Sequence, residues 1–173
     1  LLLSLRTWRA AVALDRHPGR VQLVRELVKR LGGGATVVTG DATASPLARH
    51  SWEVVLVDAP CTGTGTLRRH PDLRWRLTPA RLEALVSTQQ ELLAAGLELV
   101  APGGVLLYST CSIEPEENEE LVLRAAPTAC SLDLAGHVPT GTPWLRTSAG
   151  GIRIVPSADC DGFTLHALRR DAD

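Results

Sequence analysis

Two cysteines are the residues of this sequence that could most directly do covalent chemistry. Cys61 lies in the segment DAPCTGTGT, and Cys111 lies in YSTCS. A thiolate is a strong nucleophile, and a thiol close to the start of a helix has a lowered pKa. Because EPEENEELV after Cys111 has the composition of a helix start, the pKa of Cys111 is expected to be lowered, although its glutamates would oppose part of this effect. The competing interpretation is a pair of small buried apolar residues, which is what most free cysteines are.

Three aspartates each follow a short apolar run: Asp15 ends AAVALD, Asp41 ends ATVVTGD, and Asp58 follows EVVLV. A carboxylate at the end of a strand can accept hydrogen bonds from ribose hydroxyls or from the amino group of a purine. Each aspartate alone could equally cap a turn. Three aspartates at the equivalent position, the end of a strand, favour a ligand-binding role over three separate turn caps.

An arginine-rich segment, TLRRHPDLRWR, follows the first cysteine. Guanidinium groups suit phosphates, and an indole ring can stack on an unpaired base. A solvated basic loop with a packed tryptophan is an equally good interpretation of this segment alone. The candidate nucleic-acid contacts are Arg68, Arg69, His70, Arg74, Trp75 and Arg76.

The elements that must position these residues alternate between strands and helices. Continuous apolar runs predict buried strands, and apolar residues at helical spacing predict helices bounded by proline and glycine. A helix beginning at Pro79, with Thr78 as its N-cap, should end at Pro102 to Gly104. The expected strands are 10–15, 35–41, 53–60 and 105–109, and the other expected helices begin near residues 18 and 115. Residues 126–151 are expected to be loop with weak local structure. Residues 151–155 should pair antiparallel with 162–168.

This order predicts an α/β protein with a mostly parallel sheet and an antiparallel C-terminal strand pair. Ligands of such sheets bind outside the carboxyl ends of the strands, so the three aspartates and Cys111 are expected to meet at one edge. The length of 173 residues fits one domain spanning residues 1–173.

Composition excludes several classes of protein. With 45% hydrophobic and 21% charged residues, the chain has too much apolar material to be disordered. We find no apolar stretch long enough to cross a membrane and no secretory leader. The net charge of −1 means that nucleic-acid binding would need a local basic patch. The four cysteines show no CxxC spacing, which argues against a metal site and against a disulfide framework and favours reduced thiols in the cytoplasm.

Taken together, DAPCTGTGTLRRHPDLRWR, PGGVLLYSTCSIEPEENEELV and DGFTLHALRR resemble the RNA cytosine-5 methyltransferases of the Sun/Fmu type, whose bacterial members modify small-subunit ribosomal RNA. LDRHPGRVQLVRELVKRLG and GDA match cofactor-side segments of that family in the same order. The resemblance covers nearly the whole chain and is weakest over residues 126–150. It implies a Rossmann-like class I methyltransferase fold, S-adenosylmethionine as cofactor, and ribosomal or transfer RNA as substrate.

The resemblance also implies a role for each site residue. Cys111 would add to carbon 6 of cytosine, which makes carbon 5 electron-rich enough to take a methyl group, and Cys61 would assist release of the methylated base. Asp58 would hold the cytosine ring near N3 and also approach the cofactor. Asp15 would accept the ribose hydroxyls of the cofactor, and Asp41 would accept its adenine amino group.

The sequence departs from the family pattern in a few places. Thr62 stands where serine is expected, and DGFT stands where DGFF is usual. We find neither the family's glycine-rich cofactor loop nor the strand before it, and the chain has no methionine and begins at Leu1. We therefore expect an N-terminally truncated catalytic domain that alone binds S-adenosylmethionine weakly or not at all. Two alternatives stay open: a non-catalytic RNA-binding remnant, and a DNA cytosine-5 methyltransferase that uses Cys61 as nucleophile.

Overall fold

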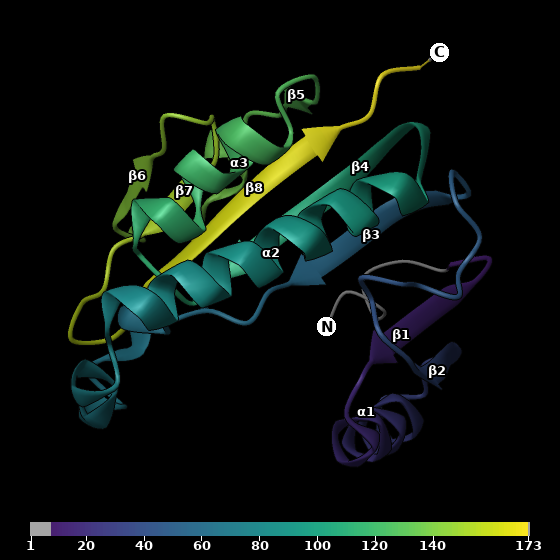
Figure 1. Cartoon of the computed structure of the whole chain (residues 1–173), viewed down its shortest axis with the longest axis horizontal. Helices are drawn as coiled ribbons and strands as arrows, with labels where there is room; N and C mark the ends of the chain where they lie inside the picture. The colour runs from purple at the N-terminus through teal and green to yellow at the C-terminus, as the bar shows by residue number, and fades with distance from the viewer. Residues whose placement is uncertain (1–7, 173) are drawn as a thin grey trace. The chain divides into compact units, whose positions relative to one another are not determined.

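The structure is a computed structural model that describes residues 8–172 (Figure 1). The chain divides into two compact units, Leu1–Leu47 and Ala48–Asp173, and each is described by itself. Among the described residues, no helix combines the length and the apolar character that crossing a membrane requires.

The first unit is a strand, a helix and a second strand, as the sequence predicts. Strands β1 (Ala11–Asp15) and β2 (Ala35–Thr39) pair in parallel, and helix α1 (Pro18–Arg30) connects them. Pro18 begins the helix because its fixed φ suits the first helical turn. Gly32 follows the helix with a φ of 65°, which glycine adopts without strain.

The second unit is built on a mixed sheet with the strand order β3-β4-β8-β7-β6. The pair β3 and β4 is parallel, whereas β8 runs antiparallel to both β4 and β7. The antiparallel C-terminal strand pair is thus confirmed, with Ile152 opposite Leu165. The strands are β3 (Trp52–Asp58), β4 (Val100–Thr110), β6 (Trp144–Arg146), β7 (Ile152–Ile154) and β8 (Phe163–Arg169), and a short β5 (Cys130–Ser131) also pairs with β8.

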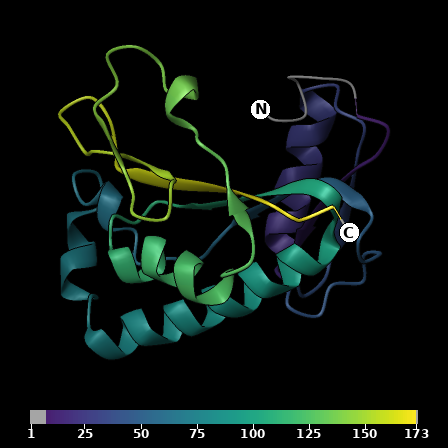
Figure 2. The same cartoon turned by 90° about the horizontal axis from the view of Figure 1, so that it is seen from above.

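Helices α2 (Pro79–Leu99) and α3 (Glu119–Ala125) lie on the same side of β4 and β8 (Figure 2). Thr78 caps α2 as predicted, because its hydroxyl accepts a hydrogen bond from the Arg81 backbone N–H at 3.2 Å. Gly96 allows α2 to approach the sheet closely, since a Cβ atom there would lie 2.8 Å from Leu106. The core between helices and sheet contains the fully buried side chains Leu93, Leu106, Tyr108, Leu121 and Leu168.

Two predicted boundaries are wrong. Helix α2 ends at Leu99, and the Pro-Gly-Gly segment that was expected to end it lies inside the irregular start of β4. The residues from Pro115 form a short 3-10 turn (Pro115–Glu117), and α3 begins only at Glu119 because Asn118, with φ −125° and ψ −104°, interrupts the helical path. The segment 126–151, expected to be loop with weak local structure, contains only the short β5, a 3-10 turn and β6, which are too short to show a period in the sequence.

Candidate active site

The two cysteines meet at one edge of the second unit, where the Cys61 and Cys111 Sγ atoms lie 3.3 Å apart. Cys61 lies in the loop after β3, and Cys111 directly follows β4. These strands are parallel neighbours, so their loops leave the sheet at the same edge. The backbone pairing continues one residue past β3, since the N–H of Ala59 donates to the carbonyl of Ser109 at 3.0 Å. Two thiols far apart in sequence therefore share one site.

The two thiols differ in their proton affinity. The contact with the Cys61 thiol lowers the pKa of Cys111 to about 7, although burial and the nearby carboxylates of Asp58 and Glu117 oppose this. The same contact, together with burial, raises the pKa of Cys61. These opposite shifts favour Cys111 as the thiol of the pair that loses its proton first. The main cause is the neighbouring thiol and not the helix start that the sequence indicated.

Glycines bring three loops together beside the thiols. The N–H of Gly65 donates to the carbonyl of Cys111 at 3.0 Å, and the N–H of Gly162 donates to the carbonyl of Gly65 at 2.7 Å. A Cβ atom on Gly65 would lie 2.9 Å from the Cys111 carbonyl oxygen and closer still to that of Gly162. Only glycine fits at this crossing, so the loop after Cys61 can lie directly against the backbone of Cys111.

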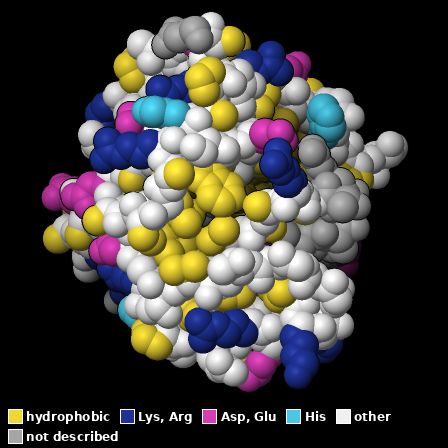
Figure 3. All heavy atoms as spheres, turned by 90° about the vertical axis from the view of Figure 1, so that its right-hand side faces the viewer, with side chains coloured by type: hydrophobic (Ala, Val, Ile, Leu, Met, Phe, Trp, Pro, Cys, Tyr) yellow, Lys and Arg dark blue, Asp and Glu magenta, His cyan; other side chains and the backbone are white. Residues whose placement is uncertain are grey.

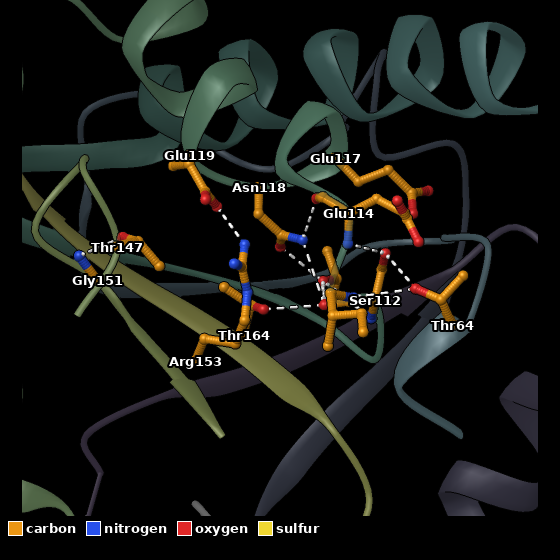
Figure 4. A network of polar contacts seen from close by, with 12 residues as sticks. Thr64, Ser112, Glu114, Glu117, Asn118, Glu119, Thr147, Gly151, Arg153 and Thr164 are labelled. Carbon is orange, nitrogen blue, oxygen red and sulfur yellow. Dashed lines mark hydrogen bonds and ion pairs between the residues drawn. The ribbon is translucent and has the colours of Figure 1, made fainter. Parts of the chain in front are cut away.

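A buried polar network fixes the backbone on the other side of Cys111 (Figure 4). The carbonyl of Ser112 accepts hydrogen bonds from the Thr164 hydroxyl at 2.8 Å and from the Asn118 amide at 3.2 Å. The Ser112 hydroxyl accepts from the N–H of Glu114 at 3.0 Å. The residue after Cys111 is thereby tied both to β8 and to the turn that precedes α3.

Glu117 and Gln89 were not recognised as site residues from the sequence. Both side chains are fully buried, and the Gln89 amide donates to the Glu117 carboxylate at 2.9 Å. In the sequence, Glu117 is one of several glutamates near an expected helix start, and nothing distinguishes it from the others. A signal for Gln89 was present, because this polar residue lies three positions after Val86 and four before Leu93 on the apolar stripe of α2.

Asp58 ends β3 at the same edge as the thiols. It accepts a hydrogen bond from the Ser109 hydroxyl at 3.2 Å, and its side chain is exposed. Its charge is among the causes that raise the pKa of Cys111, which places the carboxylate within electrostatic reach of that thiol. The structure thus brings Asp58, Cys61 and Cys111 together in the second unit.

Asp15 and Asp41 belong to the first unit, where they follow the adjacent parallel strands β1 and β2. Asp15 accepts from the backbone N–H of His17 at 2.7 Å, and Asp41 accepts from the N–H of Thr43 at 2.9 Å and from its hydroxyl. The contacts from Thr43 lower the pKa of Asp41. Within residues 8–172 both of these hydrogen bonds go to the Oδ1 atom of Asp41, which leaves its Oδ2 atom able to accept another. The pair fits a nucleoside, which offers hydroxyl and amino donors.

Within the basic loop, Arg68 and Arg69 contact an acidic partner. Both guanidinium groups form ion pairs with Asp161, the residue before Gly162. The loop itself lies against the cysteine site, because a Cβ atom on Gly63 would be 3.2 Å from the Leu73 side chain and 3.9 Å from the Cys111 Sγ atom. These two arginines therefore tie the basic loop to the β7–β8 loop as well as carrying positive charge.

The tip of the basic loop is open to solvent. The Trp75 side chain is 80% exposed, and the Arg74 guanidinium carbon lies 5.3 Å from the centre of its ring. Arg76 pairs with Asp72 at 3.2 Å, and His70 is exposed just before the 3-10 turn Pro71–Trp75. Figure 3 faces the right-hand side of Figure 1, away from the start of α2 where this loop lies, and there Lys and Arg side chains are scattered among hydrophobic and uncharged ones. An exposed arginine and indole therefore make a local contact surface.

Comparison with known proteins identifies the family. The model of the family described as "16S rRNA methyltransferase RsmB/F" matches residues 1–169. The chain belongs to this family. It is 36% identical over 155 residues to a ribosomal RNA small subunit methyltransferase B of Citrobacter koseri, and 35% identical over 167 residues to that of Vibrio vulnificus. These alignments cover 88% and 95% of this chain but only 35% and 37% of the relatives' lengths.

Solved structures confirm the Rossmann-like methyltransferase fold of this RsmB/F family member. The structure of NSun6 from Pyrococcus horikoshii with SFG superposes with a TM-score of 0.79 at 29% identity, covering 95% of this chain and 42% of that one. A methyltransferase homolog protein from Pyrococcus horikoshii gives a TM-score of 0.72 at 27% identity, covering 93% of this chain and 53% of that one. Both similarities extend over nearly all of this chain.

Proposed function

We propose that this chain carries the catalytic residues of an S-adenosylmethionine-dependent methyltransferase that modifies carbon 5 of a cytosine in ribosomal RNA. The observation that supports the proposal is the 3.3 Å contact between the Cys61 and Cys111 sulfur atoms. The pKa of Cys61 is raised and that of Cys111 is lowered. A nucleophilic thiolate with a protonated thiol beside it suits a reaction in which a carbon–sulfur bond first forms and then breaks.

The chemistry begins at carbon 6 of the cytosine, because carbon 5 alone is a poor nucleophile. The Cys111 thiolate forms a bond to carbon 6, and the displaced electron pair makes carbon 5 nucleophilic. Asp58 lies at the same edge of the sheet and holds the ring near N3, where it stabilises the adduct. S-adenosylmethionine, when bound, supplies the methyl group that carbon 5 takes.

In release, a water molecule takes the proton from carbon 5, the electron pair of that C–H bond restores the double bond to carbon 6, and the bond between sulfur and carbon 6 breaks. The electron pair of that bond then returns to the Cys111 sulfur as a thiolate. The thiol of Cys61, held beside that sulfur, donates a hydrogen bond to it and so makes it a better leaving group. Cys61 thus assists release and not attack.

The other residues bind the two substrates. Asp15 would accept the ribose hydroxyls of the cofactor and Asp41 its adenine amino group, in one catalytic domain with the cysteines. Trp75 would stack on an unpaired base, with Arg74 and the neighbouring Arg68, Arg69, His70 and Arg76 near the phosphates. Chemistry that needs two reduced thiols suits the reducing cytoplasm.

The proposal is tested by covalent trapping. The chain is incubated with a ribosomal RNA fragment that contains 5-fluorocytosine, whose fluorine cannot leave as a proton does. S-adenosylmethionine is added at a concentration raised until trapping no longer increases, because weak binding of the cofactor is expected. We expect a denaturant-stable complex whose RNA is attached to Cys111, and we expect the Cys111→Ala variant to form none. The matched control is Cys130→Ala, which removes an exposed thiol at β5 and should leave trapping intact.

Other outcomes would point elsewhere. Trapping that persists in Cys111→Ala and is lost in Cys61→Ala would contradict the assignment and indicate the chemistry of DNA-type enzymes. RNA binding without any trapped complex would favour a non-catalytic RNA-binding remnant.

A further inference from the structure

Both backbone neighbours of Cys61 are held by the same buried pair of side chains. The Gln89 amide donates to the carbonyl of Pro60 at 2.8 Å, on one side of the cysteine. On the other side, the N–H of Thr62 donates to the Glu117 carboxylate at 2.9 Å. Because Gln89 also donates to Glu117, the two side chains form one connected unit, which we call the Glu117–Gln89 clamp.

Glu117 is the centre of this clamp. Its carboxylate accepts hydrogen bonds from the Thr62 N–H, the Thr62 hydroxyl and the Gln89 amide, and it is fully buried. All three contacts are donated to it, which is the pattern that a carboxylate, an acceptor only, requires. If one partner moved away, the other buried groups would lose hydrogen bonds, which costs free energy. The network therefore favours one geometry of these side chains.

The clamp is anchored outside the cysteine loop. Gln89 belongs to α2, and Glu117 lies in the turn before α3, where its own backbone carbonyl accepts from the buried Tyr108 hydroxyl at 2.8 Å. The clamp therefore connects the loop that carries Cys61, whose regular structure is limited to short 3-10 turns, to the packed core. The packed core, through the clamp, therefore helps to fix the position of the Cys61 sulfur, in addition to the loop itself.

We propose that Glu117, with Gln89, is a positioning residue of the cysteine pair, which holds Pro60 and Thr62 so that the Cys61 sulfur stays in contact with that of Cys111. The proposed function explains why the contact between the sulfur atoms matters, and to that extent this role rests on it. The contact itself can be tested without RNA or cofactor. Among the described residues, the hydrogen bonds of the Glu117 carboxylate go to Thr62 and Gln89 and not to either sulfur, so Glu117 acts through Thr62.

The test is the pH dependence of cysteine alkylation, followed separately at each cysteine by mass spectrometry. Glu117→Asp keeps the charge but shortens the side chain, so the clamp cannot reach both partners. We expect Cys61 to move away and the alkylation midpoint of Cys111 to rise by about one pH unit. Glu117→Gln keeps the length and an acceptor oxygen for Thr62 and Gln89, so the midpoint should not rise. Glu116→Gln, an exposed neighbour, is the matched control.

A second variant and a second measurement guard against a variant that fails to fold. Gln89→Leu removes the contact with Pro60 but leaves both contacts between Thr62 and Glu117. With oxidised glutathione, the Cys111 thiolate displaces one glutathione and Cys61 then displaces the second, which closes a disulfide between them. In Gln89→Leu and Glu117→Asp we expect this closure to slow about tenfold, because reaction within a pair depends steeply on its position.

The possible results separate the explanations. If only the charge of Glu117 matters, Glu117→Asp will match the wild type and Glu117→Gln will lower the Cys111 midpoint. If Glu117 and Gln89 only stabilise the fold, the folded variants will show the wild-type midpoint and closure rate. Either result overturns the proposal. A positive result stands even if the chain transfers no methyl group, because neither measurement uses RNA or S-adenosylmethionine.

Discussion

At the scale of single residues, the chemistry depends on which of two adjacent sulfur atoms holds a proton. The thiol of Cys61 contacts Cys111, and this contact is the largest cause of the lowered pKa of Cys111. Glu117 and Asp58 act against it, so the lowered value depends on the short-range contact and not on a general positive potential. Sequence spacing alone could suggest that the cysteines are related, but it could not assign the proton.

The proton assignment predicts the effect of replacing Cys61. In Cys61→Ala the donor is lost, and we expect the pKa of Cys111 to rise from about 7 by roughly one unit or more. In Cys61→Ser a hydroxyl can still donate, so a smaller rise is expected. The measurement is the pH at which the alkylation rate of Cys111 is half-maximal. An unchanged midpoint in Cys61→Ala would show that another group lowers this pKa.

At the scale of elements, the site depends on loops that leave neighbouring strands and cross without side chains between them. The loop after β3 contacts the backbone of Cys111 through Gly65, and the loop before β8 contacts Gly65 through Gly162. Because both contacts at Gly65 are with backbone atoms, the neighbouring loops cannot relax by turning a side chain.

This crossing predicts that Gly65→Ala is damaging. We expect a loss of about 1–3 kcal/mol in the free energy of unfolding, the usual cost of overpacking, measured by urea denaturation. The Cys111 alkylation midpoint should also rise, because the loop that carries Cys61 must move. Gly136→Ala is the matched control, since nothing lies within 4 Å of a Cβ atom there. Equal stability of the two variants would mean that the crossing is not a tight contact.

The elements that the sequence predicted well are those with long or clear patterns. The strand before Asp15, the capped helix from Pro79 and the strand before Asp58 lie where apolar runs and proline indicate them. The site was predictable as far as strand ends place residues at a common edge. The Glu117–Gln89 clamp was not predictable, because the two residues are far apart in the sequence and come together only in the fold. The only sign of it in the sequence is Gln89, a polar residue among the apolar residues on one face of α2.

At the scale of the whole molecule, one buried histidine couples stability to pH. His166 on β8 is 1% exposed, and neither ring nitrogen has a hydrogen-bond partner among the described residues. Burial lowers the pKa of His166 from 6.5 to about 4, with Arg153 adding to the effect and Glu119 opposing it. The folded chain therefore holds this histidine neutral at pH values where the unfolded chain protonates it.

The consequence has a definite sign. Because the folded pKa lies below the unfolded value, the unfolded state binds the proton more tightly, and the free energy of unfolding falls as the pH drops from about 6.5 to 4. Relative to His166→Leu, the wild type should lose about 3 kcal/mol over this range. Urea denaturation of both proteins at several pH values measures the difference. A difference that stays constant with pH would contradict this account of His166.

The central claim is that Cys111 attacks the cytosine and Cys61 helps to release it. The most direct measurement uses RNA with ordinary cytosine, S-adenosylmethionine, and the Cys61→Ala, Cys111→Ala and doubly substituted chains, followed by denaturing electrophoresis. We predict that a covalent complex accumulates only in Cys61→Ala, because attack proceeds there while release is slowed. A covalent complex in Cys111→Ala, or equal amounts in all three, would contradict the claim.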